Sequence, residues 1–139
     1  MCIRDSFVTA FIGILDPAAH TVEYISGGQG PLILVTPGAV ENRVANSFPF
    51  AVVPGVEYDE PERFELEPGA TLVLLTDGFY EAAAPDSEQF GEPRVIKHVQ
   101  RRAATPVEEL IESLYEEVRV FTQGGRQADD LTAVVIRRG

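Results

Sequence analysis

The first half of the chain alternates between short apolar segments and turn signals, a pattern that predicts β-strands. The segments are rich in β-branched and aromatic residues, and Asp-Pro, Gly-Gly and Pro-Gly pairs separate them. The predicted strands cover residues 7–15, 21–25, 32–35, 63–66 and 71–75. Residues 39–60 contain Pro49, Pro54 and Gly55 and are predicted to be irregular. Because the strands recur at hairpin spacing, we expect a mostly antiparallel sheet.

The hydrophobic period lengthens in the second half of the chain, which predicts two helices. The first covers residues 92–103. The second has Thr105 as its N-cap, Pro106 at the first helical position and Glu108 closing a capping box, and it runs to about Thr122. A last strand is predicted at residues 131–137. Strands, two helices and a returning strand indicate an α+β fold.

Length and composition indicate a single domain with a sizeable core. The chain has 139 residues, of which 45% are hydrophobic, and its net charge is −11. That charge argues against a nucleic-acid or anionic-membrane partner, because no basic block offsets it. Cys2 is the one cysteine, so an internal disulfide is excluded and a cytoplasmic location is expected. No apolar run reaches the roughly 18 residues of a membrane span.

Two aspartates stand at the ends of apolar runs and are the main candidates for chemistry. Asp77 follows the run at residues 71–75, and Asp129 precedes the run at 131–136. If the two runs are adjacent strands, both carboxylates reach the same rim, where they repel each other unless a cation lies between them. Mg²⁺ and Mn²⁺ prefer such oxygen ligands. The competing interpretation is a turn or N-cap role for Asp77, with Gly78 supplying a positive φ, and a solvated turn for Asp129.

Other candidates have weaker signals. The glycines within residues 27–30 fit a phosphate cradle and a tight turn equally well. His20 and His98 are lone histidines on a turn and on a polar helix face, so both are expected to be exposed rather than to act as ligands or bases. Arg126 is expected to pair with Asp129. The glutamates of the second predicted helix are interpreted as a solvated face.

The order of motifs resembles one protein family. A Phe-Val-Thr-Ala strand is followed by Ser-Gly-Gly-Gln-Gly-Pro-Leu, Leu-Thr-Asp-Gly-Phe-Tyr-Glu-Ala, Phe-Gly-Glu and finally Gln-Ala-Asp-Asp-Leu-Thr. Each motif is weak alone, but the series resembles the SpoIIE/RsbU branch of the metal-dependent (type 2C, PPM) serine/threonine phosphatases. The resemblance extends over residues 7–138.

The resemblance implies a mostly antiparallel β-sandwich flanked by helices, with two Mn²⁺ or Mg²⁺ ions at one rim. Asp77 and Asp129 would bind one of these ions. Gly78, Asp130, Gly28 and Gln29 would have secondary roles. Water activated by the two ions would attack phosphorus. The implied substrate is a phosphoprotein such as an anti-sigma-factor antagonist, and sensor or receiver domains would precede this region.

Three departures from the family pattern qualify that reading. The family has an N-terminal Gly-Asp motif whose aspartate bridges the metals and a second acidic-Gly motif after it, and this chain lacks both. We therefore expect residues 7–139 to be the C-terminal two-thirds of a phosphatase domain, and residues 1–6 to be a non-native leader. The family also usually has Ala-Gly-His where this chain has Gly27, Gly28 and Gln29. The alternative is a non-catalytic pseudo-phosphatase that binds a regulatory partner. A nucleotide-binding module ranks last, because a strand rather than a helix follows the glycines.

Overall fold

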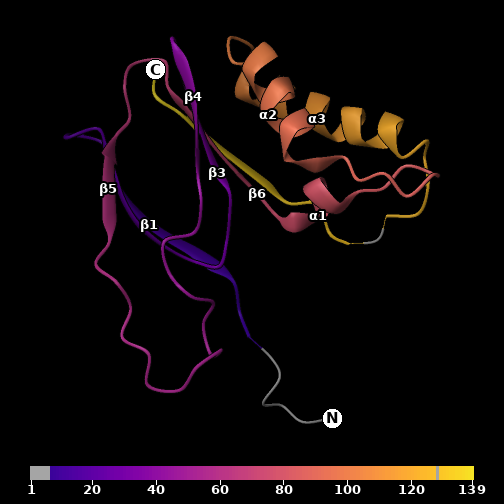
Figure 1. Ribbon diagram of the computed structural model, residues 1–139. Helices are drawn as coiled ribbons and strands as arrows, with labels where there is room; N and C mark the ends of the chain where they lie inside the picture. The colour runs from indigo at the N-terminus through magenta and orange to yellow at the C-terminus, as the bar shows by residue number, and fades with distance from the viewer. Residues whose placement is uncertain (1–6, 128) are drawn as a thin grey trace.

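The computed structural model describes residues 7–127 and 129–139, so the expected leader at residues 1–6 lies outside the described residues. Two antiparallel sheets are present (Figure 1). One has the order β1-β2-β5 and the other the order β4-β3-β6-β7. The strands are β1 (Ala10–Asp16), β2 (Thr21–Gly27), β3 (Leu32–Thr36), β4 (Ala39–Arg43), β5 (Glu62–Glu65), β6 (Thr71–Leu75) and β7 (Ala133–Arg137). The predicted antiparallel α+β architecture is confirmed.

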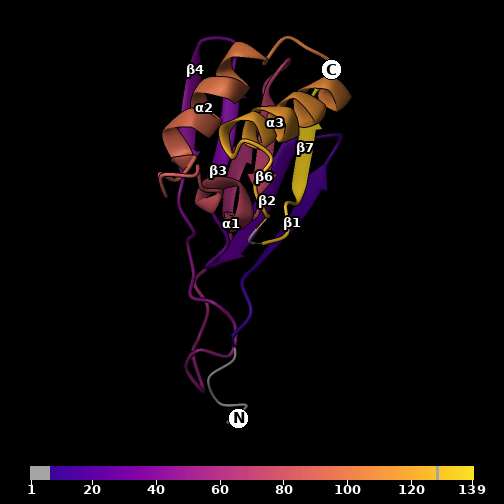
Figure 2. The same ribbon diagram turned by 90° about the vertical axis from the view of Figure 1, so that its right-hand side faces the viewer.

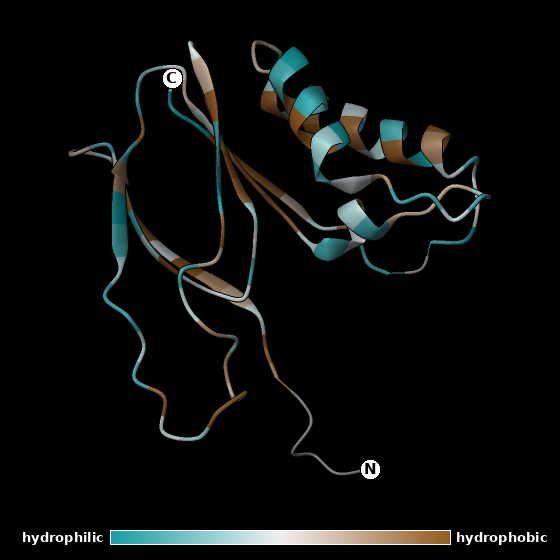
Figure 3. Ribbon diagram, viewed as in Figure 1, coloured by the Kyte–Doolittle hydropathy of each residue, from teal (hydrophilic) through white to brown (hydrophobic). Residues whose placement is uncertain are grey.

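Three helices follow β6: α1 (Asp77–Glu81), α2 (Gly91–Arg101) and α3 (Val107–Phe121). The helices α2 and α3 cover the outer face of the β4-β3-β6-β7 sheet, as the two views in Figures 1 and 2 show. Hydrophobic and hydrophilic residues alternate along both helices, whereas the central strands are largely apolar (Figure 3). No helix among the described residues is long and apolar enough to cross a membrane.

Strand β3 is central because both of its faces are buried. Ile33 and Val35 belong to the core under the helices. Leu32 and Leu34 point to the opposite face and belong to the core between the two sheets. This arrangement follows from the two-residue period of a strand, since a continuous apolar run places apolar side chains on both faces. The helices therefore pack on one face of β3, and the second sheet packs on the other.

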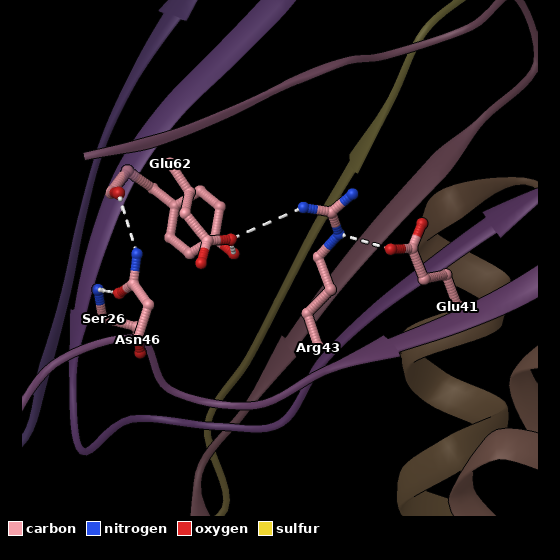
Figure 4. Close-up of polar contacts among 6 residues, drawn as sticks. Ser26, Glu41, Arg43, Asn46 and Glu62 are labelled. Atoms are coloured by element: carbon pink, nitrogen blue, oxygen red, sulfur yellow. Dashed lines mark hydrogen bonds and ion pairs between the residues drawn. The ribbon is translucent and has the colours of Figure 1, made fainter. Parts of the chain in front are cut away.

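A polar cluster joins the two sheets at one side (Figure 4). The Tyr24 hydroxyl of β2 donates a 2.8 Å hydrogen bond to Glu62 of β5. Arg43 of β4, in the other sheet, lies 3.7 Å from the same carboxylate and 2.9 Å from Glu41. Its guanidinium also lies 4.9 Å from the centre of the Phe64 ring. Burial, aided by Glu62, raises the pKa of Tyr24, so the phenol stays protonated and remains a donor.

Several predicted boundaries were wrong. Residues 39–60 are not entirely irregular, because β4 pairs with β3 through a two-residue turn at Pro37 and Gly38. The first strand begins at Ala10, and Val8 forms only an isolated bridge with Phe50. The short helix α1 was not predicted at all.

The predicted capping box at the start of α3 does not form. The Thr105 hydroxyl donates to the Arg102 carbonyl at 2.7 Å instead of capping the new helix. Pro106 occupies the N-cap position, and no side chain caps α3. The hydroxyl therefore contacts the turn that ends α2 rather than the first amides of α3.

The expectation that His98 is exposed was also wrong. Its side chain is only 2% exposed and lies between α2 and α3. The Ser113 hydroxyl donates to the Leu110 carbonyl, so His98 Nε2–H is the donor in the 2.8 Å bond to Ser113 Oγ. Nδ1 faces Glu117 at 3.4 Å. Burial lowers the pKa of His98, although Glu117 partly opposes the shift.

This burial predicts a pH-dependent stability. The unfolded His98 has the ordinary pKa of 6.5 and the folded one a lower value, so the unfolded state binds more protons as the pH falls below about 6.5. The stabilisation is complete above that pH and is lost as the pH falls through the lowered pKa. Urea unfolding between pH 7.5 and 5 should show a steeper loss of stability for the wild type than for His98→Gln. His20→Asn, in the β1–β2 turn, should keep the wild-type slope, and equal slopes for all three proteins would contradict the account.

Candidate functional site

The candidate site lies where β6 ends and β7 begins. These strands pair as far as Leu75 and Ala133, and further hydrogen bonds join the two segments beyond this point. The Thr76 amide donates to the Thr132 carbonyl at 3.0 Å, and the Thr132 amide donates to Thr76 Oγ1 at 3.0 Å. Thr76 Oγ1 in turn donates to the Asp130 carbonyl at 3.2 Å. These three bonds, which we call the Thr76 clasp, join the end of β6 to the segment that enters β7.

Gly78 brings the two segments still closer. A Cβ atom at this position would lie 2.3 Å from the Asp130 carbonyl oxygen and 3.0 Å from the Leu131 side chain. No real Cβ tolerates the first contact, so only glycine fits. The interpretation that Gly78 supplies a positive φ was wrong, because Gly78 lies inside α1 and is absent from the positive-φ positions. Its function in the fold is close approach of the backbone.

The structure thus places Asp77 and Asp129 at the same rim. Asp77 is the first residue of α1, and Asp129 directly precedes the residue that the Thr76 clasp holds. Both side chains are exposed. Asp129 Oδ1 accepts the Asp130 amide at 2.8 Å, and neither carboxylate forms an ion pair within the described residues. The expected pairing of Arg126 with Asp129 is therefore wrong, and both acids are open to a cation.

Gln29 links the β2–β3 loop to this rim. Its side-chain amide donates a 2.8 Å hydrogen bond to the carbonyl of Leu75, the residue before Thr76. The loop itself is fixed by Asn46, whose side-chain oxygen accepts the Ser26 amide at 2.7 Å (Figure 4). Gln29 therefore stabilises the rim from the β2–β3 loop. Its sequence position alone did not reveal this contact.

Gly28 is explained by local geometry. Its φ is +70°, and a Cβ there would lie 2.5 Å from Pro49 Cγ. The tight-turn interpretation therefore accounts for this glycine without a bound phosphate.

Tyr80, in α1, lies near the rim. Its hydroxyl is buried and has no hydrogen-bond partner within the described residues. Burial, together with the nearby carboxylates of Glu92 and Asp77, raises the pKa of Tyr80 well above its usual range. The phenol is therefore neutral and presents a proton close to the acids. Asn42 of β4 donates to Glu92 and orients that carboxylate.

The donor chemistry at the rim fits a hard cation only in part. Asp77 and Asp129 supply the carboxylate oxygens that Mg²⁺ and Mn²⁺ prefer. Among residues 7–127 and 129–139, however, no group of three or more His, Cys, Asp or Glu side chains is positioned to hold a metal ion. The described residues thus provide a fraction of a metal shell rather than a complete one.

Two antiparallel sheets with helices on an outer face and acids at one rim define a PP2C-type phosphatase fold. The SiaA-PP2C domain of Pseudomonas aeruginosa superimposes with a TM-score of 0.83 at 20% identity, over 94% of this chain and 52% of that one. The SpoIIE phosphatase domain of Bacillus subtilis gives 0.70 at 20%, over 94% and 56%. The RsbU and RsbW domains of a Mycobacterium tuberculosis protein give 0.74 at 23%, over 94% and 36%.

The family model described as "Stage II sporulation protein E (SpoIIE)" matches residues 2–139, so the chain belongs to the SpoIIE family. Protein IcfG of Synechocystis sp. is 24% identical over 133 residues, which cover 95% of this chain and 21% of IcfG. The chain therefore spans about a fifth of that relative and about half of the first two solved domains. The resemblance inferred from the motif order is confirmed.

The close approach at Gly78 generates a stability prediction. Gly78→Ala should destabilise the fold by about 1–3 kcal/mol, because the added methyl group must displace the Asp130 backbone. Gly38→Ala is the matched control, since nothing lies within 4 Å of a Cβ at Gly38. Urea unfolding of the two variants beside the wild type measures the difference. Equal midpoints for both variants would show that the approach at Gly78 is not a constraint.

Proposed function

We propose that this chain is the metal-binding part of a protein serine/threonine phosphatase. The observation that carries the proposal is the Thr76 clasp, which holds Asp77 and Asp129 at one rim. Membership of the SpoIIE family and the PP2C-type fold support it. The proposed reaction is hydrolysis of a phosphoserine or phosphothreonine ester by water.

The proposed cofactors are two Mn²⁺ or Mg²⁺ ions, one of which Asp77 and Asp129 would hold. Support comes from related proteins: the B. subtilis SpoIIE domain is described as Mn presoaked, and RsbX was solved in complex with magnesium. Such ions, when bound, lower the pKa of water and neutralise phosphoryl charge. Within this chain, the Thr76 clasp and Gln29 fix the position of the acids, and Gly78 removes the side chain that would separate them.

The proposed substrate is a phosphorylated regulatory protein, such as an anti-sigma-factor antagonist. The RsbU–RsbW architecture of the M. tuberculosis relative and the regulatory names of other relatives support this choice. Sensor or receiver domains are proposed as neighbours of the domain in the full-length protein, which is proposed to be cytoplasmic. The alternative is a pseudo-phosphatase that binds a regulatory partner, which a full-length protein without the metal-bridging aspartate would favour.

Turnover of p-nitrophenyl phosphate by the full-length gene product tests the proposal. With Mn²⁺, Asp77→Asn or Asp129→Asn should each reduce kcat by at least about 100-fold, because each removes a charged ligand from the ion that activates water. Glu108→Gln, an exposed acid on α3, is the matched control and should leave kcat unchanged. Absence of turnover with several metals, together with retained binding of a regulatory partner, would instead establish the pseudo-phosphatase.

A further inference from the structure

A groove of about 700 Å³ adjoins the candidate site. One wall is the end of α1 with Ala82 and Ala83, and the other is α3 from Glu112 to Thr122. Residues 124–127 and Asp129, which follow α3, close the groove. Gly78 and Asp129 thus belong both to the groove and to the proposed metal rim. A polypeptide bound in the groove could therefore extend directly to a phosphoryl group at that rim.

The dimensions of the groove fit an extended polypeptide. Thr122, the C-cap of α3, lies ten positions after Glu112, which corresponds to about 15 Å along the helix axis. An extended chain advances about 3.3 Å per residue, so this length accommodates four or five residues. The floor is apolar, with Val118 and Leu131, and it includes the ring of Tyr115. The Tyr115 hydroxyl donates to the Leu131 carbonyl, so its polar end is satisfied and the ring offers an apolar surface.

The charges along the groove are unevenly distributed. Arg119 forms a bidentate pair with Glu116, with contacts of 2.6 and 2.8 Å, so these two charges largely cancel. Glu112 remains near one end without an ion pair in the described part of the chain. Arg126 follows the turn that ends α3, where the Gly125 amide donates to the Thr122 carbonyl. It is exposed and likewise forms no ion pair among the described residues.

We propose that this groove binds the polypeptide segment that flanks the phosphorylated residue of the substrate. This inference rests on the proposed function and adds the sequence preference of the site. Apolar substrate side chains contact Tyr115 and Leu131. A basic substrate residue faces Glu112, and an acidic one faces Arg126. Because the negative and the positive side chain lie at different places along the groove, the bound segment has a preferred direction. The site then selects among phosphoproteins by the order of charges around the phosphorylated residue as well as by their number.

Two synthetic dodecapeptides test the inference on the full-length protein. Each carries a non-hydrolysable phosphonate analogue of phosphoserine at its centre and a leucine beside it. One peptide has lysines before the centre and glutamates after it, and the other has the reverse order. Fluorescence anisotropy with fluorescein-labelled peptides measures both dissociation constants. The wild type should prefer one order by at least about fivefold, the ratio expected for one partly exposed charge pair.

A charge-exchange variant makes the test specific to the groove. The double variant Glu112→Lys with Arg126→Glu should invert the preferred order, and Ala83→Trp should weaken both peptides by filling the groove. Lys97→Glu on the exposed face of α2 and Ala18→Trp in the β1–β2 turn are the matched controls, and they should keep the wild-type values. Equal affinities in the wild type, or an unchanged preference in the double variant, would overturn the inference.

Turnover of p-nitrophenyl phosphate separates this inference from the proposed function. The small ester does not extend into the groove, so its hydrolysis by the wild type reports on the rim alone. Hydrolysis without any peptide preference would overturn the groove and leave the phosphatase. An invertible peptide preference without hydrolysis would establish the groove as a peptide-binding site and refute the phosphatase.

Discussion

The Thr76 clasp is the constraint on which the candidate site depends. Thr76 and Asp130 are 54 residues apart in the chain, yet one hydroxyl joins them and a backbone pair reinforces the contact. Each such hydrogen bond contributes only about 1 kcal/mol to stability. Their main contribution is to position, because they fix the two segments that carry Asp77 and Asp129. Gly78 completes the constraint, since any larger residue would separate those segments.

The rest of the fold supports this rim from two directions. The apolar strands β3 and β6 form its base, and their side chains are buried on both faces. From the β2–β3 loop, Gln29 reaches the Leu75 carbonyl, and the cluster around Arg43 joins the two sheets. Repulsion between the rim acids is tolerable because both are exposed to water, where charges are well screened. A bound cation would convert that repulsion into a favourable interaction.

The sequence predicted the elements with strong periodicity and missed those fixed by tertiary contacts. The apolar run of β6 and the amphipathic α3 were recognisable because their patterns extend over many residues. Strand β4 was missed because its alternation is short and polar, and its position depends on pairing with β3. His98 was misplaced because its burial requires Ser113 on a second helix. The two apolar runs predicted the shared rim of Asp77 and Asp129, but the clasp that forms it depends on Thr76 and Thr132, whose partners are distant in sequence.

Paramagnetic broadening by Mn²⁺ tests most directly whether this rim is a cation site. Amide signals from ¹⁵N-labelled protein would be followed while Mn²⁺ is added in substoichiometric amounts. The account predicts that the amides of Asp77, Gly78 and Asp130 broaden first, and that Asp129→Asn abolishes this effect. The amide of Gly38, which lies at the opposite end of the sheet, should stay sharp. Broadening centred on another acidic segment, such as residues 57–62, and unchanged in Asp129→Asn would contradict the account.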